Sequence, residues 1–401
     1  MNISLRGEEV KRIISIIFIT VVVSFSIVTT NATENITESS NENTTENREV
    51  DDNKNEESGV IYDFSPIYNS LSDDVKKSLE NIGVSTVNTD ELSSITFSSV
   101  INEIANIASK NISSPLKGLI SVTALLLLCS MLSAYKNTLS CEVSTALNIS
   151  STLCITCAVA LPATEVIKNT AEIINVASNL MIAYLPIMVV IMASSGHPIR
   201  GASYYTMMLT AGEGMSQLSS KVIVPMLNMF LGLSLTSSVS PDINLSGFIG
   251  IISKTLKWLF GFGMKIFTSI LAIKQLITSS ADDVSASAVR FTLNSFIPVV
   301  GSALSDAYKT VQGSIGLLKS GVGVFVIISV AVVFLPVILQ SLMWILTLWL
   351  GKSTAEILGL SQPTKLLESV TTVFSTLLSI LLCIMSIYII STAIVLIAGR
   401  S

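Results

Sequence analysis

Long apolar segments alternate with short polar ones from residue 116 to the end of the chain. A helix that crosses the hydrocarbon core of a bilayer needs about 20 predominantly apolar residues, and seven segments approach or exceed that length. They cover residues 118–135, 145–163, 176–194, 222–238, 258–276, 321–350 and 369–398. This pattern predicts an all-α, polytopic membrane domain over residues 116–401 with about seven transmembrane helices.

Four prolines interrupt the apolar segments in similar short strings. Pro186, Pro225, Pro298 and Pro336 lie in "YLPIMV", "VIVPML", "FIPVVG" and "FLPVIL". The first two strings map on the last two at an offset of 111 to 112 residues, which predicts structural repeats over about 140–240 and 252–352. Duplicated halves with broken helices resemble the way secondary transporters build binding sites. Chance is the alternative, because such strings are common in an apolar chain with ten prolines.

The segment around Pro298 predicts a break followed by an amphipathic helix. Pro298 lacks a backbone donor and disfavours helix at the residue before it, and Gly301 adds freedom one turn later. We expect one helix to end near Ser295 and another to start after Gly301. Apolar residues then recur at spacings of four and three, at Leu304, Tyr308, Val311, Ile315 and Leu318. Asp306 either lines a cavity or lies at the membrane interface beside Lys309.

The first 32 residues predict an export signal. Arg6, Lys11 and Arg12 precede an apolar run over residues 13–28, and a small-residue cleavage site ends at Ala32. The run of 16 residues is short for a membrane span, so an uncleaved anchor is the alternative. In both cases the following segment lies outside the cytoplasm.

Two kinds of segment follow the export signal. Residues 33–60 are mainly Asn, Glu, Thr and Ser, and they cannot bury enough apolar surface to offset the entropy of ordering. We expect a disordered, acidic, extracytoplasmic tether there. In residues 61–115 apolar positions recur every three or four residues, as at Leu71, Val75 and Leu79, which predicts two short amphipathic helices on the outer membrane surface.

Composition and charge agree with a membrane protein. Of 401 residues 50% are hydrophobic and 13% charged, against about a quarter charged in soluble domains. Residues 1–115 hold 18 acids and 8 Lys or Arg, whereas 116–401 hold 10 and 15, so the net charge of -5 comes from the front of the chain. An exported N-terminal region followed by seven crossings would place the C-terminus in the cytoplasm. The distribution of Lys and Arg, Arg200 among them, supports this orientation weakly.

Few groups could carry out chemistry. His197 is the one histidine, which excludes a histidine-based triad and a multi-histidine metal site. Cys154 and Cys157 have redox-motif spacing but lie in an apolar run, where thiols act as packing residues. "LGKST" at 350–354 lacks the first glycine of a phosphate-binding loop, because position 346 is leucine. The sequence predicts no enzyme, cofactor, metal site or nucleic-acid partner.

One acidic residue and three tryptophans are informative about where the chain lies relative to the membrane. Glu213 is the strongest candidate for an intramembrane acid, and such acids are functional candidates by default. A surface loop is the alternative location for Glu213. Trp258, Trp344 and Trp349 lie near segment ends, where an indole prefers the interface.

The run "SSADDVSASAVRFTLNSFIPVVGSALSDAYKTVQGSIGLLKSGVGVF" resembles the signature region of the stage III sporulation protein AE family. The matching positions include Arg290, Phe296, Pro298, Gly301, Ser305, Asp306, Thr310 and Lys319. "LPIMVVIMASSG", "VPMLNMFLGLS" and "LSQPTK" agree as well, and the likeness covers about 140–401. Ser320, where the family often has Asn, and the more polar segment 203–221 depart from the family pattern.

The resemblance implies a membrane-embedded platform or conduit subunit of a secretion-like complex that links mother cell and forespore. It implies a place in the mother-cell membrane around the forespore and a need for the protein in forespore development. The implied partners are the bilayer, a secretion-type ATPase, ring-forming subunits and a forespore-side partner. The alternative is a stand-alone secondary transporter or permease that uses helices broken at the four prolines. A membrane enzyme is disfavoured, because no nucleophile, base and orienting group converge in the sequence.

Overall fold

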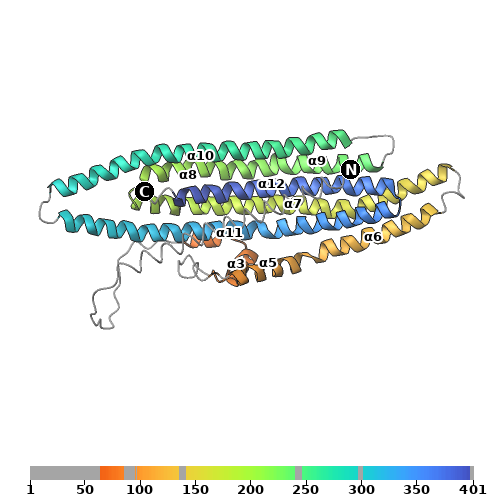
Figure 1. The fold of residues 1–401 in the computed structure, drawn as a ribbon, viewed down its shortest axis with the longest axis horizontal. Helices are drawn as coiled ribbons and strands as arrows, with labels where there is room; N and C mark the ends of the chain where they lie inside the picture. The colour runs from red at the N-terminus through yellow and green to blue at the C-terminus, as the bar shows by residue number, and fades with distance from the viewer. Residues whose placement is uncertain are drawn as a thin grey trace.

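The computed structural model describes residues 64–84, 95, 97–134, 141–239, 246–296 and 301–397, with the side chains of 278–320 and a few others outside the description. The described residues form a long bundle of helices without strands (Figure 1), which confirms the predicted all-α class. The elements are α2 (Ser65–Asn69), α3 (Asp73–Ile82), α5 (Phe97–Asn111), α6 (Ser113–Ala134), α7 (Cys141–Ser194), α8 (Pro198–Leu218), the π-helical turn η2 (Ser219–Ile223), α9 (Val224–Val239), α10 (Ser246–Phe296), α11 (Gly301–Ile357) and α12 (Ser361–Ile397).

A single helix replaces two predicted crossings. The segments 145–163 and 176–194 both belong to α7, which runs over 54 residues, or about 81 Å. The stretch between them stays helical because Glu165, Lys168 and Glu172 are spaced by three and four residues and share one exposed face of the helix. Lys168 and Glu172 form an ion pair at 3.7 Å on this face. The polar residues therefore mark one side of a helix, and the predicted division of this stretch into two membrane crossings is wrong.

The membrane crossing predicted over residues 222–238 is only the second half of a longer helical run. The semipolar stretch before it forms α8, so that α8, η2 and α9 make one helical run from Pro198 to Val239. The π-helical turn η2 ends two residues before Pro225. A proline ring clashes with the carbonyl four residues earlier, here that of Lys221, and a π turn widens the helix at this point.

Two of the four prolines do not break their helices as predicted. Pro186 lies inside α7 and Pro336 inside α11. The interval that contains Pro298, itself outside the described residues, separates the end of α10 at Phe296 from the start of α11 at Gly301, and the break predicted there is confirmed. The internal repeat stays a prediction.

Six helical stretches in the described part of the chain are long and apolar enough to cross a membrane, one fewer than predicted. They are Ser113–Ser133, Ile149–Ser194, Pro198–Ser237, Gly247–Lys274, Gly321–Ile357 and Ser361–Ala393. The continuous α7 accounts for the difference. With an even number of crossings, the helices before α6 and the C-terminus would lie on the same side of the membrane. The side on which the C-terminus lies stays a prediction.

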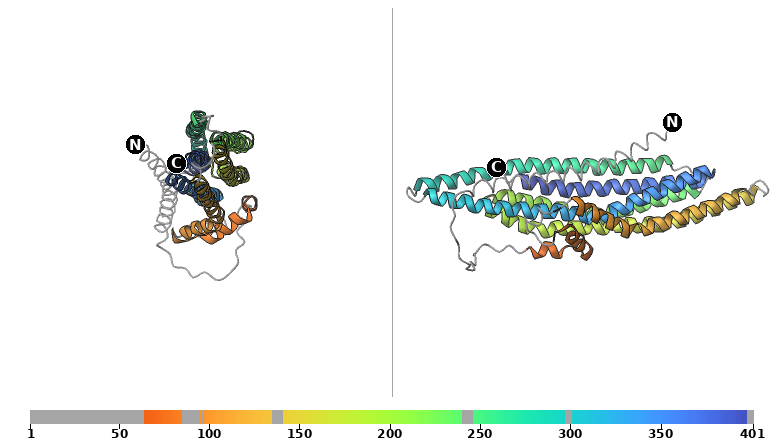
Figure 2. Two further views of the ribbon diagram at one scale, coloured as in Figure 1. Left: turned by 90° about the vertical axis from the view of Figure 1, so that its right-hand side faces the viewer. Right: turned by 60° about the horizontal axis from the view of Figure 1, so that its bottom comes forward.

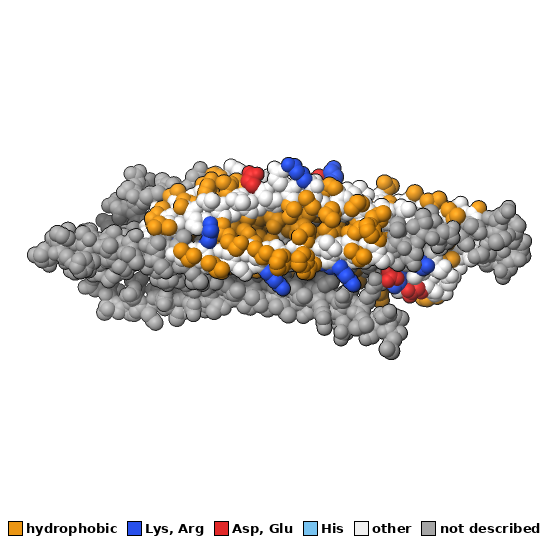
Figure 3. Space-filling model, turned by 90° about the horizontal axis from the view of Figure 1, so that it is seen from above, with side chains coloured by type: hydrophobic (Ala, Val, Ile, Leu, Met, Phe, Trp, Pro, Cys, Tyr) orange, Lys and Arg blue, Asp and Glu red, His pale blue; other side chains and the backbone are white. Residues whose placement is uncertain are grey.

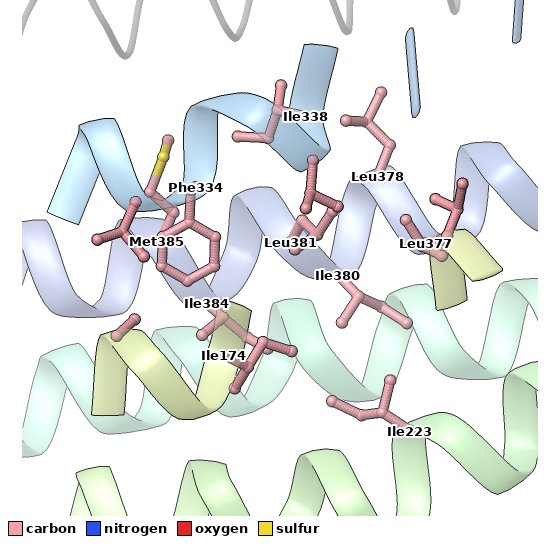
Figure 4. Packing of buried hydrophobic residues seen from close by; sticks show 14 of the residues in the cluster. Ile174, Ile223, Phe334, Ile338, Leu377, Leu378, Ile380, Leu381, Ile384 and Met385 are labelled. Carbon is pink, nitrogen blue, oxygen red and sulfur yellow. The ribbon is translucent and has the colours of Figure 1, made fainter. Parts of the chain in front are cut away.

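Helices α11 and α12 form the centre of the bundle. In their most apolar windows 67% of the residues are buried, against 17% in α10 and 22% in α6, which are outer helices. Figure 4 shows the packing, with Phe334 and Ile338 of α11 on one side of α12 and Ile174 of α7 on the other. Burial of apolar side chains on both sides of α12 explains why its sequence is apolar all round.

The two central helices share a stretch without charges. No charged residue occurs between Lys319 and Lys352 in α11, or between Glu368 and Arg400 beyond α12. At one end of this stretch the Lys352 ammonium contacts the carboxylates of Glu356 and Glu368, each at 3.4 Å. About 31 residues at 1.5 Å rise span about 46 Å, which exceeds the hydrocarbon thickness of about 30 Å.

Hydrogen bonds fix the register of α7 on α12. Ser178 lies beside Tyr388 at 2.8 Å, and Thr152 lies beside Gln362 at 3.3 Å. Both pairs are separated by 210 residues, so the two helices run parallel with a constant offset. The position of any α7 residue along the bundle therefore follows from its number.

The same holds for α10. Ser253 and Thr376 share a hydrogen bond of 2.7 Å, and the Cys383 thiol donates to the carbonyl of Phe260 at 3.2 Å. Both pairs are separated by 123 residues, so α10 also runs parallel to α12. This offset places Lys274 beside Ile397, the last residue of α12.

Beyond Lys274, α10 and α11 project as a hairpin past the end of α12. Figure 1 shows their ends extending further to the left than α7, α8 and α12. The 22 residues from 275 to the end of α10 add about 33 Å. We call residues 275–320 the hairpin tip. The predicted amphipathic helix is the first part of α11 and continues into the apolar span without interruption.

Short helices flank the bundle at the start of the described chain (Figure 2). Leu71, Val75 and Leu79 are buried, as their spacing predicted, and α3 and α5 contact α11. The Tyr68 hydroxyl donates to the Glu80 carboxylate at 3.2 Å. Desolvation raises the pKa of Tyr68 above its ordinary value, and the carboxylate of Glu80 raises it further. Tyr68 therefore keeps its proton to a higher pH than an unperturbed tyrosine, which is itself protonated at neutral pH.

Candidate functional site

Polar side chains converge in the interior between α7, α8 and α12. Ser178 donates to the carbonyl of Ile174 at 2.8 Å, so the hydrogen bond of 2.8 Å between Ser178 and Tyr388 has the tyrosine hydroxyl as its donor. One turn further along α12, Thr392 donates to the carbonyl of Tyr388 at 3.0 Å. Ser178, Tyr388 and Thr392 are all fully buried.

Two more tyrosines extend the cluster toward α8. Tyr184 of α7 and Tyr204 of α8 are fully buried, and the Tyr204 hydroxyl lies close to Tyr184 and Thr392. Neither tyrosine hydroxyl meets hydrogen-bond geometry with a described residue. The two hydroxyl groups interact with each other, and that of Tyr204 also interacts with Thr392. The junction is therefore a polar cluster inside an apolar bundle.

A buried arginine lies about one helical turn before Tyr204 in α8. Arg200, in the first turn of α8, is fully buried, and His197 just before it is 5% exposed. The turn before α8 has Gly196 in the left-handed region at φ +85°. At Gly201 a Cβ atom would lie 3.3 Å from Cβ of Met192, so α8 starts in close contact with α7. Ionisable residues in apolar helices face the interior and are functional candidates.

The cluster is suited to holding helices together. Among the described residues no group of three or more His, Cys, Asp and Glu side chains could hold a metal ion. Hydroxyl groups that bond across helices act as polar contacts in membrane proteins, where lipid provides no competing donors. We conclude that the cluster, defined as Ser178, Tyr184, Tyr204, Tyr388 and Thr392, fixes α12 against the hairpin of α7 and α8.

Replacing Tyr388 with phenylalanine is expected to lower the free energy of unfolding by about 0.6 kcal/mol, the average for interhelical hydrogen bonds in membrane proteins. The loss is small because the ring keeps its packing. Unfolding in mixed micelles with increasing sodium dodecyl sulfate measures it. Ser178→Ala and the double variant complete a cycle, and additive effects of the two changes would contradict a direct bond between them.

The signature residues lie apart from this cluster. Arg290, Phe296, Gly301, Ser305, Asp306, Thr310 and Lys319 belong to the hairpin tip, whose backbone is described and whose side chains are not. The register places the tip beyond the end of α12. The interruption in the sequence thus connects two helices at the end of the bundle, and the roles of the individual residues stay predictions.

Glu213 lies in α8 and is exposed, so the alternative of a surface loop is wrong. Cys154 and Cys157 are unpaired thiols on the exposed side of α7.

The sequence analysis missed most of the cluster and the buried arginine. Arg200 was used only as one of the Lys and Arg residues that predict the orientation of the protein in the membrane. The string "PIRGASYY" nevertheless places it between two long apolar segments. The rule that flagged Glu213 as an intramembrane acid would also have flagged this arginine. Tyr184, Tyr204 and Tyr388 carry no comparable signal, because a tyrosine in an apolar segment is typical of both cores and interfaces.

Comparison with known proteins gives a consistent result. A family model described as Stage III sporulation protein AE matches residues 83–399, which is more than half of the chain. Stage III sporulation protein AE of Bacillus subtilis (strain 168) is 22% identical over 158 residues, which are 39% of this chain and 40% of that protein. The match thus spans less than half of the relative's length. No solved structure matches the chain.

Proposed function

Since the chain belongs to the stage III sporulation protein AE family and so has a role in sporulation, we propose that it is a membrane-embedded platform or conduit subunit of a complex that links mother cell and forespore. It resides in the mother-cell membrane that surrounds the forespore. Its partners are a secretion-type ATPase, ring-forming subunits and a forespore-side protein. Energy comes from the partners, and the chain itself is not an enzyme.

The hairpin tip supports a platform role. It extends about 33 Å past the end of α12, and it carries the residues through which the sequence resembles the family. A rigid helical projection at one end of a membrane bundle presents a surface that proteins outside the bilayer can reach. The tip is therefore the docking element for neighbouring subunits in this proposal.

The stand-alone transporter has less support than its sequence pattern indicated. Transporter sites depend on helices that are interrupted near the middle of the membrane, whereas α7 and α11 continue through Pro186 and Pro336. Flux of a solute into liposomes that contain this protein alone, abolished by Glu213→Gln, would favour the transporter over the platform.

The double variant Pro298→Ala, Gly301→Leu tests the platform role. It favours a continuous helix at the place where α10 now ends and α11 begins. The tip should therefore change shape while the bundle remains in the membrane. We expect other membrane proteins to stop co-purifying with the variant in mild detergent, and spore yield to fall to that of a strain without the protein.

The control is Gly232→Leu on α9, where a Cβ atom would meet nothing within 4 Å. This variant should keep its partners and its spore yield. Normal co-purification and normal spores with the double variant would sink the docking role of the tip.

A further inference from the structure

The outer surface of α10 is an apolar face with lysines along one flank. Its exposed apolar side chains are Phe248, Ile251, Trp258, Leu259, Phe262, Ile266, Ile270, Ile273 and Ile277. Trp258 and Phe262 stack with ring centroids 5.0 Å apart. Lys254 and Lys265 are also exposed, and a spacing of eleven residues, about three turns, points them in the same direction. We call this surface the α10 face.

Lipid is a poor match for the α10 face. Lysine at the centre of a membrane helix costs about 2.5–3.5 kcal/mol in insertion experiments. Lys265 lies near the middle of the exposed apolar run, more than two helical turns from either end of the span Gly247–Lys274. A protein surface with acidic groups at the matching depth would cover the apolar side chains and neutralise the lysines.

The chain itself carries such a surface on α7 and α8. Glu165 and Glu172 of α7 and Glu213 of α8 are exposed. The two helices are joined at this place by a hydrogen bond of 2.8 Å from Ser216 to Asn175. We call this surface the α7–α8 face. It also contains two exposed lysines, of which Lys168 pairs with Glu172 at 3.7 Å and Lys221 lies in η2.

The acids and lysines lie at matching positions along the bundle. Helix α8 runs antiparallel to α7, so the contact of Ser216 with Asn175 places Glu213 at the height of Ser178, which lies beside Tyr388. The offset of 123 residues places Lys265 beside Tyr388 as well. Glu213 and Lys265 are therefore at the same height.

A second pair matches in the same way. The offset of 210 residues places Glu165 and Lys168 at the heights of residues 375 and 378 of α12, and the offset of 123 places Lys254 at the height of residue 377. Of the two α7 residues, Lys168 is already paired with Glu172, so Glu165 is the acid available to Lys254. A difference of two residues is about 3 Å along a helix. Two acids and two lysines thus have the same order and nearly the same spacing along the bundle axis.

Charged side chains border the apolar surface that is seen from above. Seen from above (Figure 3), blue side chains border the middle of the orange apolar surface along one long edge, and red and blue ones lie together along the opposite edge. None of the described pairs of oppositely charged side chains within the chain joins Glu213 to Lys265 or Glu165 to Lys254. The two sets face outward, where another molecule can reach them.

We propose that the α10 face binds the α7–α8 face of a second copy of this chain, with Lys265 against Glu213 and Lys254 against Glu165. Copies in one membrane share one orientation, so rotation about the membrane normal keeps equal heights opposite each other. The two faces differ, so the contact is heterologous and repeats from copy to copy, which gives a ring when the rotation closes. This assembly does not depend on the proposed role in a sporulation complex.

Crosslinking between copies tests the contact directly. In the full chain with its five cysteines changed to alanine, one tagged copy carries Glu213→Cys and a differently tagged copy carries Lys265→Cys. We expect oxidation in the membrane to give a disulfide-linked dimer that contains both tags. Lys274→Cys is the matched control, because it lies nine residues further along the same helix, about 13 Å away, and should not link to Glu213→Cys.

Two results would overturn the proposal. Equal linking of Glu213→Cys to both partners would mean random collision. Rapid labelling of Glu213→Cys by a membrane-impermeant maleimide in the assembled protein would mean that this face lines a water-filled space. The hairpin-tip variant keeps both faces, so it should still crosslink when its partners are lost, which separates a failure of this contact from a failure of the platform role.

Charge exchange in the chain with its native cysteines provides an independent readout. Glu213→Lys alone should weaken association between copies by about tenfold or more, the lower end for close charge pairs across interfaces. Adding Lys265→Glu to the same chain re-creates an opposite pair at every contact and should restore association. Native mass spectrometry of the detergent-solubilised protein measures both. Failure of the second change to restore what the first removes would contradict the pairing.

Discussion

Replacing Arg200 with methionine is expected to lower the free energy of unfolding by about 3–5 kcal/mol, which is the cost of removing one member of a buried charged interaction. Arg200 is fully buried in the first turn of α8 and makes polar interactions there. Methionine keeps most of the apolar stem, so the loss reports on the guanidinium itself.

The effect should be specific to the guanidinium group. Arg200→Lys keeps a positive charge but loses the planar donor fork, so it should recover only part of the stability. Lys221→Met removes an exposed cation a few turns further on and should change the stability by less than about 0.5 kcal/mol. Unfolding in mixed micelles compares the variants, and equal stability of Arg200→Met and the native chain would exclude a structural role for the buried charge.

Replacing Trp344 with alanine should lower the free energy of unfolding by a similar amount, about 3–5 kcal/mol. The indole is 1% exposed and stacks on Phe374 with centroids 6.0 Å apart. Its six-membered ring also fills the space above Gly118 of α6, where a Cβ atom would lie 2.7 Å from Cζ3 of the tryptophan. Trp344 thus links the outer helix α6 to the two central helices.

Substitutions at Gly118 and Trp344 should have strongly non-additive effects on the free energy of unfolding. Gly118→Leu alone forces a bulky side chain against a ring that has no room to move, which costs about 1–3 kcal/mol or more. In the double variant with Trp344→Ala, the leucine occupies part of the cavity. The free energy of unfolding lost in the double variant should therefore be smaller than the sum of the two single losses, by up to about 3 kcal/mol. Gly232→Leu, at an open position, should cause no loss. Simple additivity would show that the two residues do not share this space.

The class of the protein could be predicted from the sequence, and so could the break near Pro298. Apolar segments of sufficient length require lipid or a large core whatever their arrangement. A proline and a glycine separated by two residues disfavour helix for local reasons that no packing removes cheaply. The buried positions of Leu71, Val75 and Leu79 also followed from their spacing, because a helix places such residues on one face.

Other features depend on contacts between distant segments. The polar stretch around Lys168 looked like a loop, but in α7 its charges occupy one exposed face while the opposite face packs on neighbouring helices. Pro186 and Pro336 are breakers by local rules, yet the helices around them continue because adjacent helices hold both halves in line. Trp344 was expected at the interface, and close approach of α6 at Gly118 buries it.

The sequence by itself therefore determined that this chain is a helical membrane protein with a sporulation-family signature at a helix break. Only the tertiary structure decided that the signature lies on a projecting hairpin, that Arg200 and three tyrosines are buried in the interior, and that Glu213 and Lys265 lie at the same height on different faces. The reason is physical. Helix formation and lipid solvation depend on residues near one another in the chain, whereas burial and register depend on which helices pack together.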